Sequence, residues 1–166
     1  MTRRRHSEVK FILLMAAVVI VDQISKYMVR IALAEGERLD VIRGFFAVTH
    51  FQNDGAAFSS FRGQRQLLVI LSAVVVICAL IFLWKNRKGS PLLKVSLALL
   101  ASGGIGNLID RICIGTVTDM LSFSIFPPIF NIADSAVVIG CFLLMFYEFR
   151  DDFLRRRRGE SGEDDE

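Results

Sequence analysis

Residues 67–84, with the sequence LLVILSAVVVICALIFLW, decide the fold class, because this 18-residue run contains no charged side chain. A helix needs about 20 apolar residues to cross the roughly 30 Å hydrocarbon core of a bilayer, so the run is long enough to span a membrane. The rest of the chain is also apolar: hydrophobic residues make up 53% of its 166 residues, and its mean hydropathy is +0.48. The sequence therefore predicts an integral membrane protein rather than a soluble globule.

Three further apolar segments accompany this run. Together they give four predicted spans, at residues 11–29, 67–84, 92–109 and 129–147. Each span is close to the length that a transmembrane helix requires. We therefore predict an all-α membrane protein with four transmembrane helices, in which residues 1–150 form a single integral-membrane domain and residues 151–166 form a charged cytoplasmic tail.

The distribution of basic residues predicts the orientation in the membrane. Most of the 20 Lys and Arg residues precede the first span, lie in the turn between the second and third spans, or follow the fourth. Because cytoplasmic loops carry an excess of Lys and Arg, both termini and this turn are predicted to be cytoplasmic. The basic clusters adjoin apolar runs and lack interleaved aromatic residues, so orientation explains them better than nucleic-acid binding. The acidic residues 160–166 predict a solvated, disordered end.

Both segments on the opposite side of the membrane are unusually apolar. Residues 37–61 have a β-like, aromatic composition, and Asn53-Asp54-Gly55 is a strong turn signal. We predict that they form a small extracytoplasmic β-sheet element between helices 1 and 2, lying on the outer membrane face. Residues 122–128 are too apolar for a free loop, and we expect them to rest in the membrane interface.

Polar residues of the spans converge near the outer face. Charges inside a membrane are costly, so each needs a partner or a function. With the predicted orientation, all of them except Lys94, which can snorkel inward, come to lie near one depth. The outer set consists of Asp22, Lys26, Asn107, Asp110, Arg111, Asn131 and Asp134, with Asp119 in the connection between the last two spans.

Several of these residues have structural explanations. Asp22 and Lys26 stand four residues apart, which allows either a helical ion pair or a direct contact with a substrate. Asn107, Asp110 and Arg111 share one helix face, where they can satisfy one another, and this favours a scaffold over chemistry. The glycines at 103, 104 and 106 allow neighbouring helices to approach closely.

Asp119 and Asp134 are the best candidates for chemistry, since neither has a Lys or Arg within one helical turn. Two carboxyl groups within a few ångströms cannot both ionise cheaply and share one proton near neutral pH. One can then activate water as a base while the other protonates the attacked carbonyl. This pattern indicates an aspartic protease without a metal or cofactor, and the sequence supplies no His–Cys cluster for a metal site. A proton- or ion-coupled transporter is the alternative, because intramembrane aspartates are common there.

Five short motifs follow one another along the spans. They are Asp22-Gln23-Ile24-Ser25-Lys26, Asn53-Asp54-Gly55-Ala56-Ala57-Phe58, Gly106-Asn107-Leu108-Ile109-Asp110-Arg111, Val117-Thr118-Asp119 and Phe130-Asn131-Ile132-Ala133-Asp134-Ser135. In these motifs and their order the chain resembles the bacterial lipoprotein signal peptidases, the type II signal peptidases, which are integral-membrane aspartic proteases. The resemblance covers about residues 11–149.

The resemblance implies a function and a set of site residues. It implies a catalytic dyad of Asp119 and Asp134, without metal or cofactor. It implies supporting roles around the substrate for Asp22, Lys26, Asn53, Gly55, Asn107, Asp110, Arg111 and Asn131. The implied substrate is a prolipoprotein whose cysteine bears a diacylglyceryl group, cleaved on the amino side of that cysteine. Met120, where the family often has an aromatic residue, is a small departure that leaves the dyad intact.

The resemblance and the charge pattern together imply a location and partners. We expect a multi-pass protein of the bacterial cytoplasmic (inner) membrane, with its active site near the outer face and membrane lipids around it. We further expect a monomer that does not bind nucleic acid.

Overall fold

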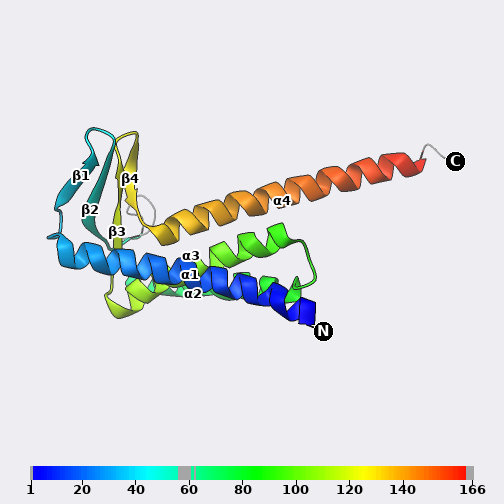
Figure 1. Ribbon diagram of the computed structural model, residues 1–166, viewed down its shortest axis with the longest axis horizontal. Coiled ribbons are helices and arrows are strands. Elements are labelled where there is room, and N and C mark those ends of the chain that lie inside the picture. Colours follow the sequence, from blue (N-terminus) through cyan, green and yellow to red (C-terminus); the bar gives the residue numbers. More distant parts are fainter. Residues whose placement is uncertain (1, 56–60, 62, 164–166) are drawn as a thin grey trace.

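Four long helices dominate the computed structural model, which describes residues 2–55, 61 and 63–163 (Figure 1). They are α1 (Thr2–Ala32), α2 (Arg65–Lys85), α3 (Pro91–Cys113) and α4 (Ile132–Glu163). Each contains a segment long and apolar enough to cross a membrane: Glu8–Ala32, Arg65–Lys85, Pro91–Cys113 and Ile132–Leu154. The four predicted helices are confirmed, but α1 begins at Thr2 rather than at residue 11, and α4 ends at Glu163 rather than at residue 147.

Helix α3 lies at the centre of the bundle and packs against the other three helices. It begins at the N-cap Ser90, whose side chain accepts a hydrogen bond from the Leu92 N–H, followed by Pro91 in the first turn. Its glycines each admit a different neighbour. Gly104 faces Val76 of α2, Gly106 faces Asp22 of α1, and Gly103 faces the carbonyl of Ala133 in α4.

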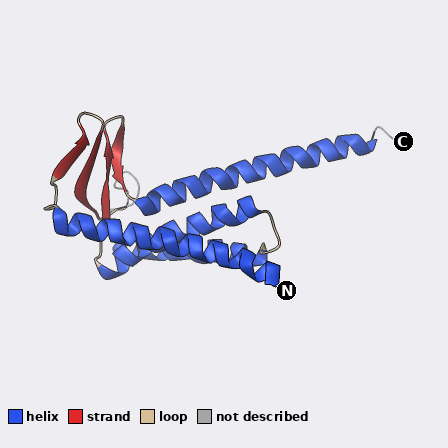
Figure 2. Ribbon diagram, in the orientation of Figure 1, coloured by secondary structure: helices blue, strands red, loops and turns tan. Residues whose placement is uncertain are grey.

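An antiparallel four-stranded sheet stands at one end of the bundle (Figure 2). Its strands are β1 (Arg38–Ile42), β2 (Phe46–Asn53), β3 (Val117–Phe123) and β4 (Phe126–Phe130), in that order across the sheet. Strands β1 and β2 confirm the sheet predicted between the first two helices. The sequence did not predict that β3 and β4, between α3 and α4, complete the same sheet.

A cluster of aromatic rings explains the apolar composition of both outer segments. The Phe123 ring lies 4.8 Å from that of Phe46 and 5.9 Å from that of Phe130, measured between ring centroids. Phe45 and Phe126 pack edge-on against this group. Most of the apolar residues at 122–128 therefore belong to strands joined by aromatic packing, and only Ser124 and Ile125 form the turn between them.

Helix α4 is longer than expected and extends past the ends of the other helices (Figure 1). The sequence predicted disorder from residue 160, but the helix continues to Glu163, so that prediction was wrong for residues 160–163. Pairs spaced four residues apart support the extension. Arg156 forms a 3.0 Å ion pair with Asp152, and the Arg157 guanidinium lies 5.4 Å from the centre of the Phe153 ring.

At the other end of the bundle from the sheet, Lys94 joins three segments although it is only 5% exposed. Its Nζ donates a 2.8 Å hydrogen bond to the Arg87 carbonyl and lies 3.6 Å from the Glu8 carboxylate. It also lies 5.1 Å from the centre of the Phe11 ring. The Lys94 charge is therefore matched at this end of the bundle, away from the polar residues beside the sheet.

Candidate active site

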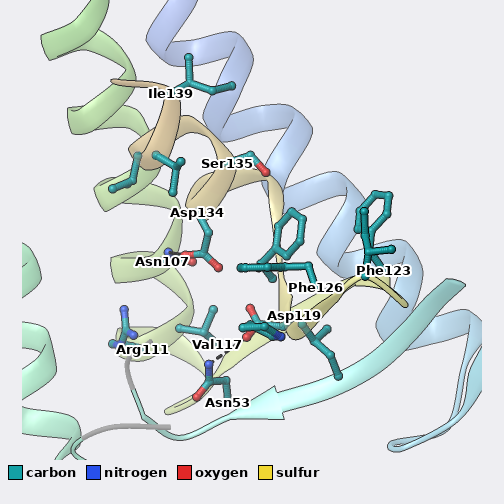
Figure 3. A pocket seen from close by; sticks show the side chains of 16 residues that line it. Asn53, Asn107, Arg111, Val117, Asp119, Phe123, Phe126, Asp134, Ser135 and Ile139 are labelled. Atoms are coloured by element: carbon teal, nitrogen blue, oxygen red, sulfur yellow. Dashed lines mark hydrogen bonds between the residues drawn. The ribbon is translucent and has the colours of Figure 1, made fainter. Parts of the chain in front are cut away.

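Two aspartates line one pocket between the sheet and the start of α4 (Figure 3). Asp119 comes from β3 and is 1% exposed, and Asp134 comes from the first turn of α4. The pocket has a volume of about 770 Å³, and most of its wall is apolar. The apolar wall is formed by Val117, Phe123, Ile125, Phe126, Pro128, Ile129, Phe130, Val137, Val138 and Ile139.

Asp119 is held by two side-chain amides. Asn53 of β2 donates a 2.9 Å hydrogen bond to its Oδ2, and Asn131 donates a 2.6 Å hydrogen bond to its Oδ1. Burial and the nearby charge of Asp134 raise the pKa of Asp119 to about 7, although the two amide hydrogen bonds act in the opposite direction. Asp119 can therefore hold a proton at neutral pH, where an exposed aspartate cannot.

Asp134 is held by a reciprocal cap at the start of α4. The Asn131 side-chain oxygen accepts a 2.8 Å hydrogen bond from the Asp134 N–H, and the Asp134 carboxylate accepts one of 3.3 Å from the Asn131 N–H. This exchange has the form of a capping box, with residues three apart satisfying free N–H groups at the helix start. Asn107 donates a further 2.7 Å hydrogen bond to Asp134 Oδ1. The local sequence therefore fixes both the start of the helix and the carboxylate.

Asn131 connects the two aspartates. Its Nδ2 donates to Asp119, its backbone N–H and side-chain oxygen bond to Asp134, and Nδ2 also lies 3.1 Å from Asn107 Oδ1. Asn131 is fully buried, so these bonds do not compete with water. One amide thus sets the relative position of both carboxylates.

A buried ion network lies behind the aspartates. Lys26 Nζ lies 2.9 Å from Asp22 Oδ2, 3.2 Å from Asp110 Oδ2 and 3.0 Å from Asn107 Oδ1. Asp22 also accepts a 2.9 Å bond from the Ala133 N–H, one residue before Asp134. Asp22, Lys26 and Asp110 are fully buried and do not line the pocket, so the structure favours the ion-pair explanation over a direct substrate contact.

Arg111 and Gly55 meet at another edge of the pocket. Arg111 Nη2 donates a 3.1 Å hydrogen bond to the Gly55 carbonyl, and the Gly55 N–H donates one of 2.9 Å to Asn53 Oδ1. Arg65 in turn bonds to the Arg111 and Ile112 carbonyls at the end of α3. The rest of the second motif, Ala56 to Phe58, lies outside the described residues.

The structure thus brings all ten predicted site residues together. Asn53, Asn107, Arg111, Asp119 and Asp134 line the pocket. Lys26, Asn131 and Gly55 form hydrogen bonds with them, and Asp22 and Asp110 form ion pairs with Lys26 behind the pocket. Among the residues that the structure describes, no group of three or more His, Cys, Asp and Glu side chains is arranged to hold a metal ion.

Sequence reasoning missed several residues of this network. Gln23 Nε2 lies 3.1 Å from Asp22 Oδ2, from Asp110 Oδ1 and from the Gly106 carbonyl. It stands within the first motif, which was its only signal. Arg30, His50, Gln52 and Thr118 form hydrogen bonds on the other face of the sheet. Thr118 stands within the fourth motif, and no motif or spacing indicated the other three.

Comparison with known proteins gives consistent matches. The family model described as "Signal peptidase (SPase) II" matches residues 14–150. Two relatives are named "Lipoprotein signal peptidase". The one from Halothermothrix orenii is 41% identical, and the match covers 81% of this chain and 92% of that protein. The one from Moorella thermoacetica is 42% identical, and the match covers 81% of this chain and 89% of that protein. A solved chain described as a bacterial membrane enzyme superposes with a TM-score of 0.81 at 33% identity, covering 86% of this chain and 89% of its own.

A second solved chain, also described as a bacterial membrane enzyme, has a TM-score of 0.78 at 33% identity and covers 86% of this chain and 94% of its own. The family model extends from the first predicted span to the fourth and includes all five motifs. The chain therefore belongs to the signal peptidase II family.

Proposed function

We propose that this protein is a membrane-embedded aspartic endopeptidase that removes the signal peptide from diacylglyceryl-modified prolipoproteins. The observation that carries the proposal is the pair of buried aspartates, Asp119 and Asp134, which line one pocket and are joined by Asn131. Cleavage falls on the amino side of the lipidated cysteine. Family membership argues against the transporter alternative.

The dyad works with one shared proton. Because the pKa of Asp119 is about 7, the pair holds a single proton near neutral pH. The ionised carboxylate takes a proton from water as the water oxygen attacks the scissile carbonyl carbon, and the protonated carboxyl donates its proton to the carbonyl oxygen. The resulting tetrahedral intermediate collapses with proton transfer to the leaving amine. The two aspartates titrate as a coupled unit, so their roles are assigned to the pair.

The supporting residues keep the dyad in position. Asn53, Asn107 and Asn131 donate to the carboxylates and limit their rotation. The network of Asp22, Lys26 and Asp110 ties α1 to α3 behind them. Arg111, held at Gly55, places a positive charge at the pocket edge, where it can bind a carbonyl oxygen of the substrate.

The pocket suits a substrate anchored in lipid. Its aromatic and aliphatic wall, from β3, β4 and α4, matches acyl chains and an apolar signal peptide. We infer that both termini are cytoplasmic and that the sheet lies at the outer face of the bacterial inner membrane, because the basic residues flank the opposite end. A substrate held in the outer leaflet then presents its scissile bond at the depth of the dyad. The protein acts as a monomer, since one chain supplies the complete residue set.

Substitution of either aspartate tests the proposal. Asp119→Asn and Asp134→Asn should each lower cleavage of a lipidated precursor by about 10²–10⁴-fold, since each removes one partner in proton transfer. Cleavage is followed by the mobility shift of the precursor in detergent with purified protein.

The matched control is Asp40→Asn, at an exposed aspartate of β1 that pairs only with Arg38 among the interactions described. It should cleave at the wild-type rate. Wild-type cleavage by Asp119→Asn or Asp134→Asn would contradict the dyad, and loss of cleavage on adding a metal chelator would contradict the aspartic mechanism.

A further inference from the structure

A second polar network lies on the face of β2 and β3 that turns away from the pocket. Side chains of a strand alternate between its two faces. Asn53 and Asp119 meet on the pocket face, so Gln52 and Thr118, which stand directly opposite each other in the β2–β3 ladder, meet on the other. Gln52 Nε2 donates a 3.2 Å hydrogen bond to Thr118 Oγ1 there. Thr118, the residue beside Asp119, is therefore held by Gln52, which does not line the pocket.

His50 connects this pair to the end of α1. Its Nδ1 lies 2.9 Å from the Leu33 carbonyl, which can only accept, so Nδ1 carries the proton. Nε2 then accepts a 2.7 Å bond from Gln52 Nε2, whose other hydrogen serves Thr118. Gln52 Oε1 accepts a 2.7 Å bond from the Thr116 hydroxyl. One tautomer of His50 thus satisfies the whole chain of hydrogen bonds.

The backbone of His50 is anchored to the same region. Its N–H donates a 3.1 Å bond to the Glu37 carbonyl, and its carbonyl accepts one of 2.8 Å from the Gly36 N–H. The β2–β3 register shifts between Val48 and Phe51, which places a β-bulge at His50, beside the pair of Phe51 and Asp119. Bulges redirect side chains near active sites but weaken the local ladder. At this bulge, His50 is held by residues 33–37 on the β1 side of β2.

Thr118 forms hydrogen bonds with three elements and is fully buried. Besides Gln52 of β2, Arg30 of α1 donates a 3.1 Å bond to Thr118 Oγ1, and the Thr118 N–H donates one of 3.1 Å to Asp110 Oδ2 of α3. The position of Thr118 therefore fixes β3 relative to both helices. Since Asp119 is the next residue, a shift of Thr118 moves the carboxylate.

We propose that His50 is a positioning residue for Asp119, acting through Gln52 and Thr118. The inference rests on the proposed function, because it concerns the geometry of that dyad. His50 does not line the pocket. A displacement of about 1 Å at a reacting group costs about a hundredfold in rate, so a chain that holds β3 in place affects catalysis without affecting substrate binding.

Two conservative substitutions of His50 separate positioning from simple support. Asparagine can place its amide nitrogen where Nδ1 lies, which keeps the bond to Leu33 and loses the bond to Gln52. Glutamine can place its amide oxygen where Nε2 lies, which keeps the bond to Gln52 and loses the one to Leu33. If the role of His50 were only to bind the β-bulge to the end of α1 through Leu33, asparagine would be the better replacement, because it keeps that bond.

We expect His50→Asn to lower kcat for a lipidated precursor about 10- to 100-fold with KM within about twofold. His50→Gln should retain kcat within about threefold. Equal kcat values for the two variants, or a raised KM at unchanged kcat, would overturn the proposal. Both are measured on detergent-purified, monodisperse protein.

Thr118→Val provides the second measurement, because it keeps the side-chain volume and removes the hydroxyl at the end of the chain. It should lower kcat as His50→Asn does. The double variant with His50→Asn and Thr118→Val should be no slower than Thr118→Val alone, as expected for residues in one network. Wild-type kcat for Thr118→Val would overturn the proposal even if no His50 variant folds. Asp119→Asn is measured in parallel, and wild-type cleavage by that variant would refute the proposed function itself.

Discussion

Asp119 binds its proton much more tightly than an exposed aspartate does. Its pKa of about 7 arises first from burial and then from the charge of Asp134. In the proposed mechanism, the pair loses its shared proton as the pH rises through 7, both carboxylates become ionised, and no acid remains to protonate the substrate carbonyl. Activity should therefore be present below this pH and decline above it.

We predict that kcat falls above about pH 7, approaching a tenfold loss per pH unit. The measurement is the pH dependence of kcat for a lipidated precursor at saturating substrate, with the folded state checked at each pH. A constant kcat from pH 7 to 9 would show that the dyad does not depend on the Asp119 proton.

The sequence identifies the pocket residues for an energetic reason. A charge or amide in an apolar span is costly, so residues such as Asn107 and Asp134 stand out against their surroundings. His50, Gln52 and Thr118 lie in connecting segments, where polar residues are ordinary before folding. They become informative only when the sheet connects them to the end of α1 and buries His50 and Thr118, and no spacing rule reveals that.

At the scale of helices and strands, β4 shows why half of the sheet was missed. Its sequence, FPPIF, contains two prolines, and proline cannot donate a hydrogen bond to a ladder. The strand is nevertheless formed, because β4 is at the edge of the sheet and pairs only through Phe126 and Phe130. Composition predicted β1 and β2, whereas β4 required knowledge of its place in the sheet.

The glycines of α3 give a prediction at this scale. A Cβ at position 103 would clash with the carbonyl of Ala133, a backbone atom of α4, and would lie 3.1 Å from the Val137 nitrogen. A Cβ at position 104 would lie 2.6 Å from Val76 Cγ2, a side-chain methyl of α2, and would meet no backbone atom of a neighbouring helix. Gly103→Ala should therefore destabilise the protein by about 1–3 kcal/mol, as overpacking does, and Gly104→Ala by less.

The measurement is the melting temperature of Gly103→Ala and of Gly104→Ala in the same detergent. Unfolding is followed by intrinsic fluorescence or by aggregation. Because α4 carries Asp134, Gly103→Ala should also reduce cleavage. Equal melting temperatures for the two variants would show that α3 and α4 do not pack as described.

For the whole molecule, the polar residues are divided between two ends. The dyad, the ion network and the sheet gather at one end, and Lys94 with its partners Glu8 and Arg87 lies at the other. Hydropathy predicted the helices and charge predicted their direction, because both depend on the membrane as a solvent. The union of two separate segments in one sheet depends on tertiary contacts and was not predicted.

The proposed orientation predicts the labelling of Cys113. This exposed cysteine ends α3 beside the sheet, whereas Cys78 and Cys141 lie within α2 and α4. A membrane-impermeant maleimide should label Cys113 in intact spheroplasts. In a Cys113→Ser background, Asn86→Cys, just after α2 at the other end, should be labelled only after permeabilisation. The reverse pattern would invert the proposed topology.

The divided sheet also has a consequence for biogenesis. Asn53 and Asp119 are 66 residues apart in the chain, and both α2 and α3 are inserted between them. Their contact has to wait until two further helices have crossed the bilayer, and Asp134 arrives later still with α4. A nascent or truncated chain lacking α4 therefore carries no dyad. The proposed dyad is assembled only when insertion is complete, so we expect the protein to be inactive throughout its own synthesis.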